Sequence, residues 1–93
     1  MRHSLVVEGN LLHRVAPQYP LMAQQLAIEG SVLIKAVISR AGTIEQAEVT
    51  SGHPLLSPAA LNAVRQWRYR PYSLNREPIE VETEIAVRFL LDR

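Results

Sequence analysis

The sequence predicts one small α+β domain in which two helices pack on one face of a three-stranded antiparallel sheet. Its 93 residues suffice for a single domain, of which 47% are hydrophobic and 20% charged, a composition typical of chains that fold around a core. Two short stretches carry apolar residues at helical spacing, and three stretches alternate apolar and polar residues with a period of two. Together these patterns give the fold class.

The first helix is predicted over residues 21–29. Pro17 and Pro20 require an extended entry, and Pro20 suits the first turn of a helix. Met22, Ala23 and Leu26 then share one face. Gly30 is predicted to end the helix in the left-handed conformation.

A β-hairpin is predicted next, over residues 31–51. Val32, Ile34 and Ile38 point to one side of its first strand. The turn at residues 40–43 places Gly42 where a positive φ is needed. Apolar residues in the second strand change parity between Ile44 and Ala47, and this change predicts a β-bulge or a late start to the pairing.

The second helix is predicted to begin at Ser57 and Pro58, with the serine as N-cap and the proline as first helical residue. Its buried stripe comprises Ala60, Leu61, Val64 and Trp67. Residues 69–72 should be extended because of Pro71, and residues 73–78 are predicted to form a polar loop.

The strongest pattern is the alternation over residues 79–91, which predicts a long last strand with one buried face. Such a strand would span about 43 Å at roughly 3.3 Å per residue, so its end must pair, twist away or fray. Residues 1–14 are predicted to form an N-terminal arm or an extra strand, and residues 15–93 the domain itself.

Nothing in the sequence favours an enzyme. The chain has no cysteine, and His3, His13 and His53 stand far apart without a metal-binding spacing, so no catalytic residue, metal or cofactor is expected. Glu80 and Glu84 lie with Glu82 on one strand face, which we interpret as a solvated face with Lys35 as a cross-strand partner.

Nucleic-acid binding is not expected either. Arg65, Arg68 and Arg70 lie near Trp67 and could form a basic stacking surface. However, Trp67 belongs to the buried stripe of the second helix, and a net charge of +1 is too balanced for a phosphate-binding face.

A small open sheet must have two edges, and an edge strand exposes main-chain groups that can pair with another chain. The charges of the last strand could instead serve to prevent such pairing. Composition alone leaves both interpretations open.

Several motifs, in their order and spacing, resemble the C-terminal periplasmic domain of TonB-type energy transducers. The resemblance covers residues 15–91. Its motifs are Pro17-Gln18-Tyr19-Pro20, Glu29-Gly30-Ser31-Val32, Gly42-Thr43-Ile44, Ser51-Gly52, Ala63-Val64-Arg65-Gln66-Trp67-Arg68-Tyr69-Arg70-Pro71 and the closing alternating strand.

This resemblance implies a function. Such transducers are anchored in the inner membrane, associate with the ExbB–ExbD motor, and bind the TonB box of outer-membrane receptors as a strand added to the last strand of the domain. Carried over to this sequence, the partner-binding residues are Pro17, Gln18, Tyr19 and Pro20 in a receptor-facing turn, and Val81, Glu82, Thr83, Glu84, Ile85, Ala86, Val87, Arg88 and Phe89 along the edge.

One residue departs from the family pattern. Ala16 stands where the best-known enteric members have a receptor-contacting glutamine. An alternative interpretation is a freestanding, homodimerising interaction domain, since two copies could pair along the same edge.

Overall fold

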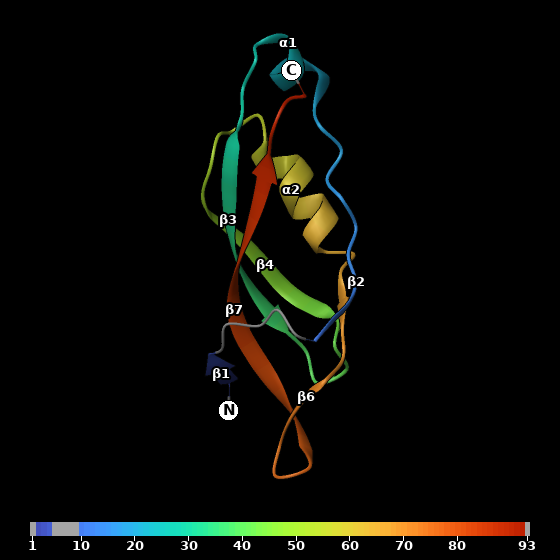
Figure 1. Cartoon of the computed structure of the whole chain (residues 1–93). Helices are drawn as coiled ribbons and strands as arrows, with labels where there is room; N and C mark the ends of the chain where they lie inside the picture. Colours follow the sequence, from blue (N-terminus) through green and yellow to red (C-terminus); the bar gives the residue numbers. More distant parts are fainter. Residues whose placement is uncertain (1, 5–9, 93) are drawn as a thin grey trace.

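The computed structural model describes residues 2–4 and 10–92 and has a five-stranded sheet at its centre (Figure 1). The order of the principal strands in this sheet is β1-β7-β3-β4, and β6 also pairs with β7. The elements of the described part are β1 (Arg2–Ser4), β2 (Leu11–His13), α1 (Leu21–Gln25), β3 (Gly30–Ile38), β4 (Ile44–Ser51), α2 (Ser57–Val64), β5 (Arg68–Tyr69), β6 (Tyr72–Leu74) and β7 (Glu77–Phe89).

The predicted three-stranded antiparallel sheet is confirmed as β4, β3 and β7. Ile34 in the middle strand lies opposite Val49 of β4 and Ile85 of β7. β1 extends this sheet beyond β7 and runs parallel to it, while β2 and β5 form a separate two-stranded antiparallel ribbon. The fold is therefore α+β, with more strands than the sequence pattern predicted.

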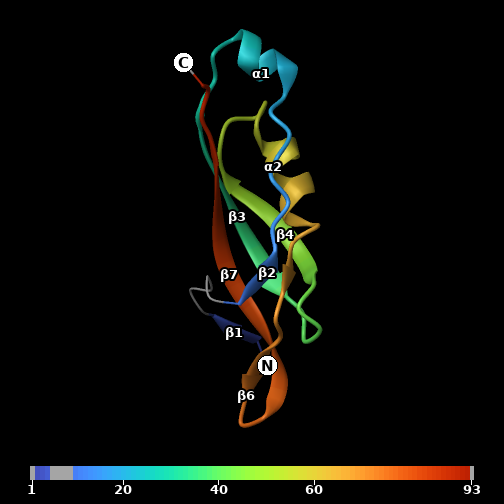
Figure 2. The ribbon, with the colours of Figure 1, turned by 45° about the vertical axis from the view of Figure 1, so that its right-hand side comes forward.

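Figure 2 shows α2 and the segment between β2 and α1 on the same side of the sheet. α2 packs against β4 and β3, and its residues Ala60 and Val64 are fully buried. The alternation of β7 is confirmed from Val81 to Phe89, where every second residue is buried. Its core-facing residues are Val81, Thr83, Ile85, Val87 and Phe89.

The hairpin between β3 and β4 has the predicted bulge. Ile38 lies opposite Ile44, whereas Val37 lies opposite Gln46, so Glu45 is the extra residue. Gly42 closes the turn with the predicted positive φ of 86°. The backbone of Tyr69 also requires glycine there, because a Cβ at residue 42 would lie 1.9 Å from the Tyr69 carbonyl oxygen. The amide of Tyr69 donates to the carbonyl of Gly42 at 2.8 Å.

The predicted polar loop at residues 73–78 is wrong, because β6 and β7 form a hairpin there. Tyr72 lies opposite Ile79, and the two turn residues Asn75 and Arg76 have φ values of 52° and 68°. Two consecutive positive φ values are typical of the tight turns that suit the strand twist. β6 thus pairs with the first residues of the long last strand. The molecule extends 49 × 21 × 17 Å.

α1 ends earlier than predicted, at Gln25 rather than residue 29. The amide of Ile28 donates to the carbonyl of Ala23 at 2.8 Å, and the amide of Ala27 donates to Gln24 at 3.1 Å. These two bonds define a Schellman motif. Its left-handed residue is Ala27, with a φ of 56°, and not the predicted Gly30.

Ala27→Gly is expected to raise the free energy of unfolding by about 0.5–1 kcal/mol, because a residue with a Cβ is strained in the left-handed region. Urea denaturation followed by circular dichroism measures this change. The control is Ala59→Gly inside α2, which should lower stability by about 0.5–1 kcal/mol. Destabilisation by both variants would contradict the strained conformation at Ala27.

The N-terminus of α2 differs from the prediction in its capping. Ser57 does not act as a side-chain N-cap; its hydroxyl donates to the carbonyl of His53 at 2.9 Å. The Nδ1 atom of His53 accepts the amide of Leu55 at 3.0 Å, so this histidine organises the turn before the helix. α2 ends at Val64, and Trp67 follows in a turn that keeps it in the core.

Candidate functional site

The site predicted along β7 is an open strand edge for part of its length. β3 pairs with one side of β7 from Val81 to Phe89. On the other side, β1 covers residues 80–82. Within the described ranges 2–4 and 10–92, no strand pairs with the outer side of β7 at residues 83–89. Of the predicted edge residues, Val81 and Glu82 therefore lie between two strands, and the others lie on the open stretch.

A groove of about 420 Å³ lies beside residues 84–86 of this open stretch. Its lining residues come from the β2 segment, from the chain around β5, and from the middle of β7. They are Leu11, Arg14, Trp67, Tyr69, Glu84, Ile85 and Ala86. Consecutive side chains of a strand point to opposite faces, so three consecutive β7 residues can line one groove only along the main-chain edge. The groove thus faces the edge itself.

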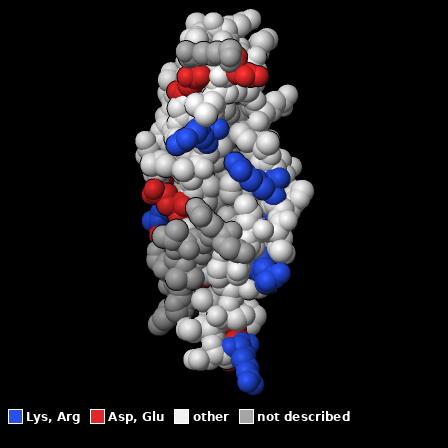
Figure 3. Space-filling model, viewed as in Figure 1, with Lys and Arg blue, Asp and Glu red and all other residues white. Residues whose placement is uncertain are grey.

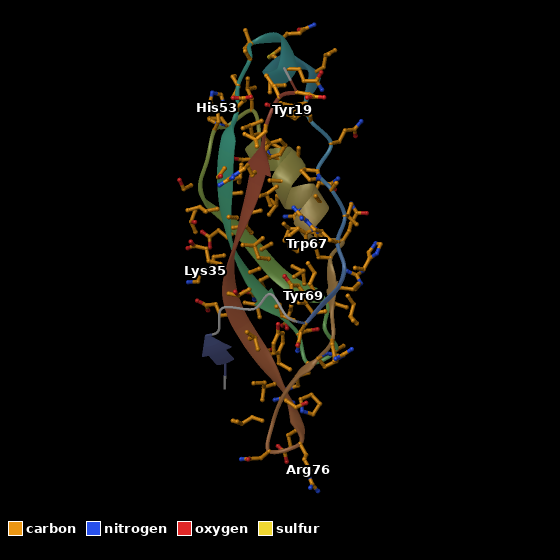
Figure 4. The ribbon with its side chains drawn as sticks, in the orientation of Figure 1. Tyr19, Lys35, His53, Trp67, Tyr69 and Arg76 are labelled. Carbon is orange, nitrogen blue, oxygen red and sulfur yellow. The ribbon has the colours of Figure 1, made fainter. Side chains whose placement is uncertain are left out.

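Trp67 forms one wall of this groove and is fixed from two directions (Figure 4). Its side chain is only 5% exposed, and its indole Nε1 donates to the carbonyl of Val15 at 2.9 Å. The guanidinium carbon of Arg14 lies 5.5 Å from the centroid of the indole ring, within the range of a cation–π interaction. The buried ring therefore holds a cation at the mouth of the groove.

Tyr69 lies beside Trp67 and is buried as well. Burial, and to a smaller extent the neighbouring Tyr72, raises the pKa of Tyr69 to about 12. Its phenol is therefore neutral at physiological pH. The wall that Tyr69 and Trp67 form beside the edge is aromatic and uncharged.

The predicted receptor-facing turn lies near the C-terminal end of β7. The ring of Tyr19 meets Phe89 edge-on, with centroids 5.3 Å apart and planes at 86°. The hydroxyl of Tyr19 donates to the carbonyl of Ile28, so this residue is half-buried and ties the turn to the chain after α1. Gln18 is exposed, whereas Pro17 and Pro20 are half-buried. The structure thus brings the two predicted sets together through Tyr19 and Phe89.

The opposite face of the sheet carries charged residues, as predicted. Lys35 pairs with Glu82 at 3.1 Å, which confirms the predicted cross-strand ion pair. Because the side chain of Lys35 is 53% exposed, solvent screens this pair and its contribution to stability is small. Among residues 2–4 and 10–92, no group of three histidines or carboxylates could hold a metal ion.

The basic residues do not form a continuous surface on the face seen in Figure 3, where uncharged areas separate them. Trp67, the one tryptophan of the chain, is buried in the core and does not offer a free stacking face. Both observations argue against a nucleic-acid interface on this side. None of the helices in the described part is long and apolar enough to cross a membrane.

Comparison with known families identifies the domain. Residues 15–91 match the family described as the Gram-negative bacterial TonB protein C-terminal domain. The chain belongs to this family. The resemblance found in the sequence motifs is therefore confirmed.

Relatives of this TonB-family chain include Protein TonB of Vibrio cholerae, which is 32% identical over 81 residues covering 85% of the chain. Protein TonB of Escherichia coli is 39% identical over 62 residues covering 64% of the chain. The aligned regions amount to 33% and 26% of these two proteins. The chain therefore spans about a third or less of the length of these relatives.

The fold of the TonB-family chain also matches a solved structure. The solution NMR structure of the Pseudomonas aeruginosa TonB CTD superposes with a TM-score of 0.77 and covers 97% of this chain and 94% of that one. Sequence identity is 24%, so this comparison supports the fold alone. It agrees with the α+β architecture described above.

Sequence reasoning missed the contribution of the N-terminal region to the groove. Leu11 and Arg14 fall within the predicted arm of residues 1–14, yet both line the groove beside β7. Leu11 reaches this place because β2 pairs with β5, where it lies opposite Tyr69. No local pattern reveals a contact between residues this far apart in sequence.

Proposed function

We propose that this domain is the periplasmic coupling module of a TonB-type energy transducer, and that it binds the TonB box of outer-membrane receptors as a strand added to β7. Membership of the TonB family supports the transducer role. The observation that carries the binding mode is that no strand of the described part of the chain pairs with the outer side of β7 at residues 83–89, and that a groove lies beside residues 84–86. An exposed edge of this kind binds extended peptides through main-chain hydrogen bonds.

The proposal includes partners beyond this chain. The two relatives named TonB are about three to four times as long as the region that they share with this chain, which leaves room in those proteins for a membrane anchor and spacer. In the proposed transducer, an inner-membrane anchor associates with the ExbB–ExbD complex, and the domain carries force to the receptor. This role is mechanical, so the domain needs no catalytic group and no cofactor.

The energetics favour a transient complex. An added strand of about six residues forms roughly six hydrogen bonds, each contributing about 0.5–1.5 kcal/mol net. Ordering the free peptide costs about 1–2 kcal/mol per residue, so these two contributions nearly cancel. Side-chain contacts with the groove must supply the remaining free energy, and a dissociation constant of micromolar order is expected.

A series of N-methylated peptides tests the strand addition. Because main-chain pairing tolerates many sequences, a synthetic peptide with valine and threonine at alternate positions can serve as the probe. Each peptide of the series carries one N-methylated amide and so lacks one hydrogen-bond donor. Alternate amides of the added strand point toward β7, and methylation of any one of these should weaken binding about tenfold or more. Methylation of the amides between them, which point away from β7, should leave the affinity unchanged. Amide chemical shifts in NMR titrations measure the affinity and locate the site.

The largest shifts are expected at residues 83–89. Binding that is indifferent to N-methylation, or shifts confined to the far edge at β4, would contradict the proposal. Sedimentation of the protein alone at the same concentration is the control, because two copies pairing along β7 would compete with the peptide.

A further inference from the structure

We infer that Glu29 is a positioning residue that holds the chain beyond β7 in line with this strand. The docking edge, which is the outer side of β7 at residues 83–89, thereby extends to Leu90. The inference rests on the proposed function, because it assumes that a strand is added along this edge. It gives that strand a longer footprint and names the side chain that maintains it.

A side chain takes over where the pairing between β3 and β7 stops. The last pair of this ladder is Gly30 and Phe89. Gly30 has a φ of 143°, and the residues before it connect β3 with α1. The amide of Leu91 donates to Oε1 of Glu29 at 2.8 Å, in a partly buried contact. A hydrogen bond to a carboxylate is stronger than one to a neutral carbonyl, so the chain is firmly attached beyond the last strand pair.

The burial of the side chains indicates that the chain stays extended past β7. Phe89 is 2% exposed and Leu90 is 65% exposed, whereas Leu91 is half-buried and Asp92 is exposed. This sequence continues the alternation of β7, in which successive side chains point to opposite faces. In the described part of the chain no strand pairs with residues 90–92, so the bond to Glu29 is what keeps them extended.

The direction of the Leu91 amide determines which main-chain groups face outward. In an extended strand, the N–H and C=O groups of one residue point to one side, and those of the next residue point to the other. The Leu91 amide points toward Glu29, on the side of β3. The main-chain groups of Leu90 therefore point to the outer side. Three residues of the docking edge share this direction, namely Glu84, Ala86 and Arg88.

The segment that carries Glu29 is itself fixed. The hydroxyl of Tyr19 donates to the carbonyl of Ile28, the residue before Glu29. The ring of Tyr19 also meets Phe89 edge-on, so the same tyrosine contacts the end of β7. Glu29 and the end of β7 therefore have a fixed spacing, which lowers the entropy that is lost when their hydrogen bond forms.

Two synthetic valine–threonine peptides, of six and eight residues, test this inference. The shorter peptide can pair with the three outward-facing residues of the docking edge, and the longer one can reach Leu90 as well. Hydrogen exchange of single amides, followed by NMR, shows which main-chain groups are paired. In the free wild-type protein, the Leu91 amide should exchange at least about tenfold more slowly than the Leu90 amide. Saturation with the eight-residue peptide should slow the Leu90 amide about tenfold as well.

Variants of Glu29 give the decisive comparison. Glu29→Ala removes the acceptor, so the Leu91 amide should exchange faster and the eight-residue peptide should no longer slow the Leu90 amide. This peptide should bind about threefold more weakly, while the six-residue peptide should bind as it does to wild type. Glu29→Gln keeps an acceptor oxygen and should restore the slow exchange of both amides, which a charge effect alone would not produce. Glu48→Ala removes an exposed carboxylate of β4 and should match wild type in every measurement.

The outcomes separate this inference from the proposed function. If the eight-residue peptide slows the Arg88 amide of wild type but not the Leu90 amide, the docking edge ends at Phe89. That result would overturn the inference and leave strand addition intact. Slow exchange of the Leu90 amide in the complex of Glu29→Ala would overturn the role of Glu29. If neither peptide at millimolar concentration slows the outward-facing amides of β7, the strand addition itself is wrong.

Discussion

Gly42→Ala is expected to lower the free energy of unfolding by at least about 3 kcal/mol. A Cβ at this position would lie 1.9 Å from the carbonyl oxygen of Tyr69, which is far inside van der Waals contact. The backbone would have to move, and the 2.8 Å hydrogen bond from the amide of Tyr69 to Gly42 would be strained or lost. Equilibrium denaturation followed by fluorescence of Trp67 measures the loss.

Gly30→Ala is the matched control. Gly30 also has a positive φ, of 143°, but no heavy atom beyond its chain neighbours lies within 4 Å of a Cβ built there. Gly30→Ala should therefore lower the free energy of unfolding by about 1–2 kcal/mol, through the strained backbone conformation alone. If the two variants lost the same stability, the close approach between Gly42 and Tyr69 would not be the cause.

Phe89→Ala is expected to cost about 3–5 kcal/mol, because it leaves a cavity at the end of β7. Phe89 is 2% exposed and packs edge-on against Tyr19, so the truncation also removes the support of the turn at residues 17–20. Thermal unfolding should show a fall of roughly 4–8 °C for each kcal/mol lost.

The neighbouring Leu90→Ala provides the control for this truncation. Leu90 follows the last residue of β7 and is 65% exposed, so its truncation should change stability by less than about 0.5 kcal/mol. Similar losses for both variants would contradict the alternation that places Phe89 in the core.

Local patterns predicted much of the fold. The period of two along β7, the positive φ of Gly42 and an irregular pairing in the second strand of the hairpin each follow from neighbouring residues. The structure has all three, with the irregularity as a bulge at Glu45. These features are determined by chain geometry over a few residues, where sequence and conformation are directly linked. The burial of Trp67 was predictable for the same reason.

The errors lie where tertiary contacts decide the local conformation. Gly30 is the better left-handed residue by intrinsic preference, yet the turn forms at Ala27, where the hydroxyl of Tyr19 binds the following residue, Ile28. The predicted loop at residues 73–78 became a hairpin because Asn75 and Arg76 adopt positive φ values without a glycine.

The candidate site was predicted in part. The alternation predicts the strand β7, and the resemblance to the TonB family implied its open edge. The parallel pairing of β1 at residues 80–82 shortens this edge, and a segment as short as β1 shows no periodicity from which a strand could be predicted. The contact between Arg14 and Trp67 joins two segments that are far apart in the sequence, so local sequence patterns could not predict it.

The direction of β7 has a mechanical consequence. This strand has 13 residues in a molecule 49 Å long, and nine residue pairs join it to β3. Tension along a peptide laid lengthwise on β7 acts in shear, so the interstrand hydrogen bonds resist rupture collectively. Tension across the strand would instead unzip them one after another at lower force. A peptide bound in the proposed way would therefore resist a pull along β7 more strongly than a pull across it.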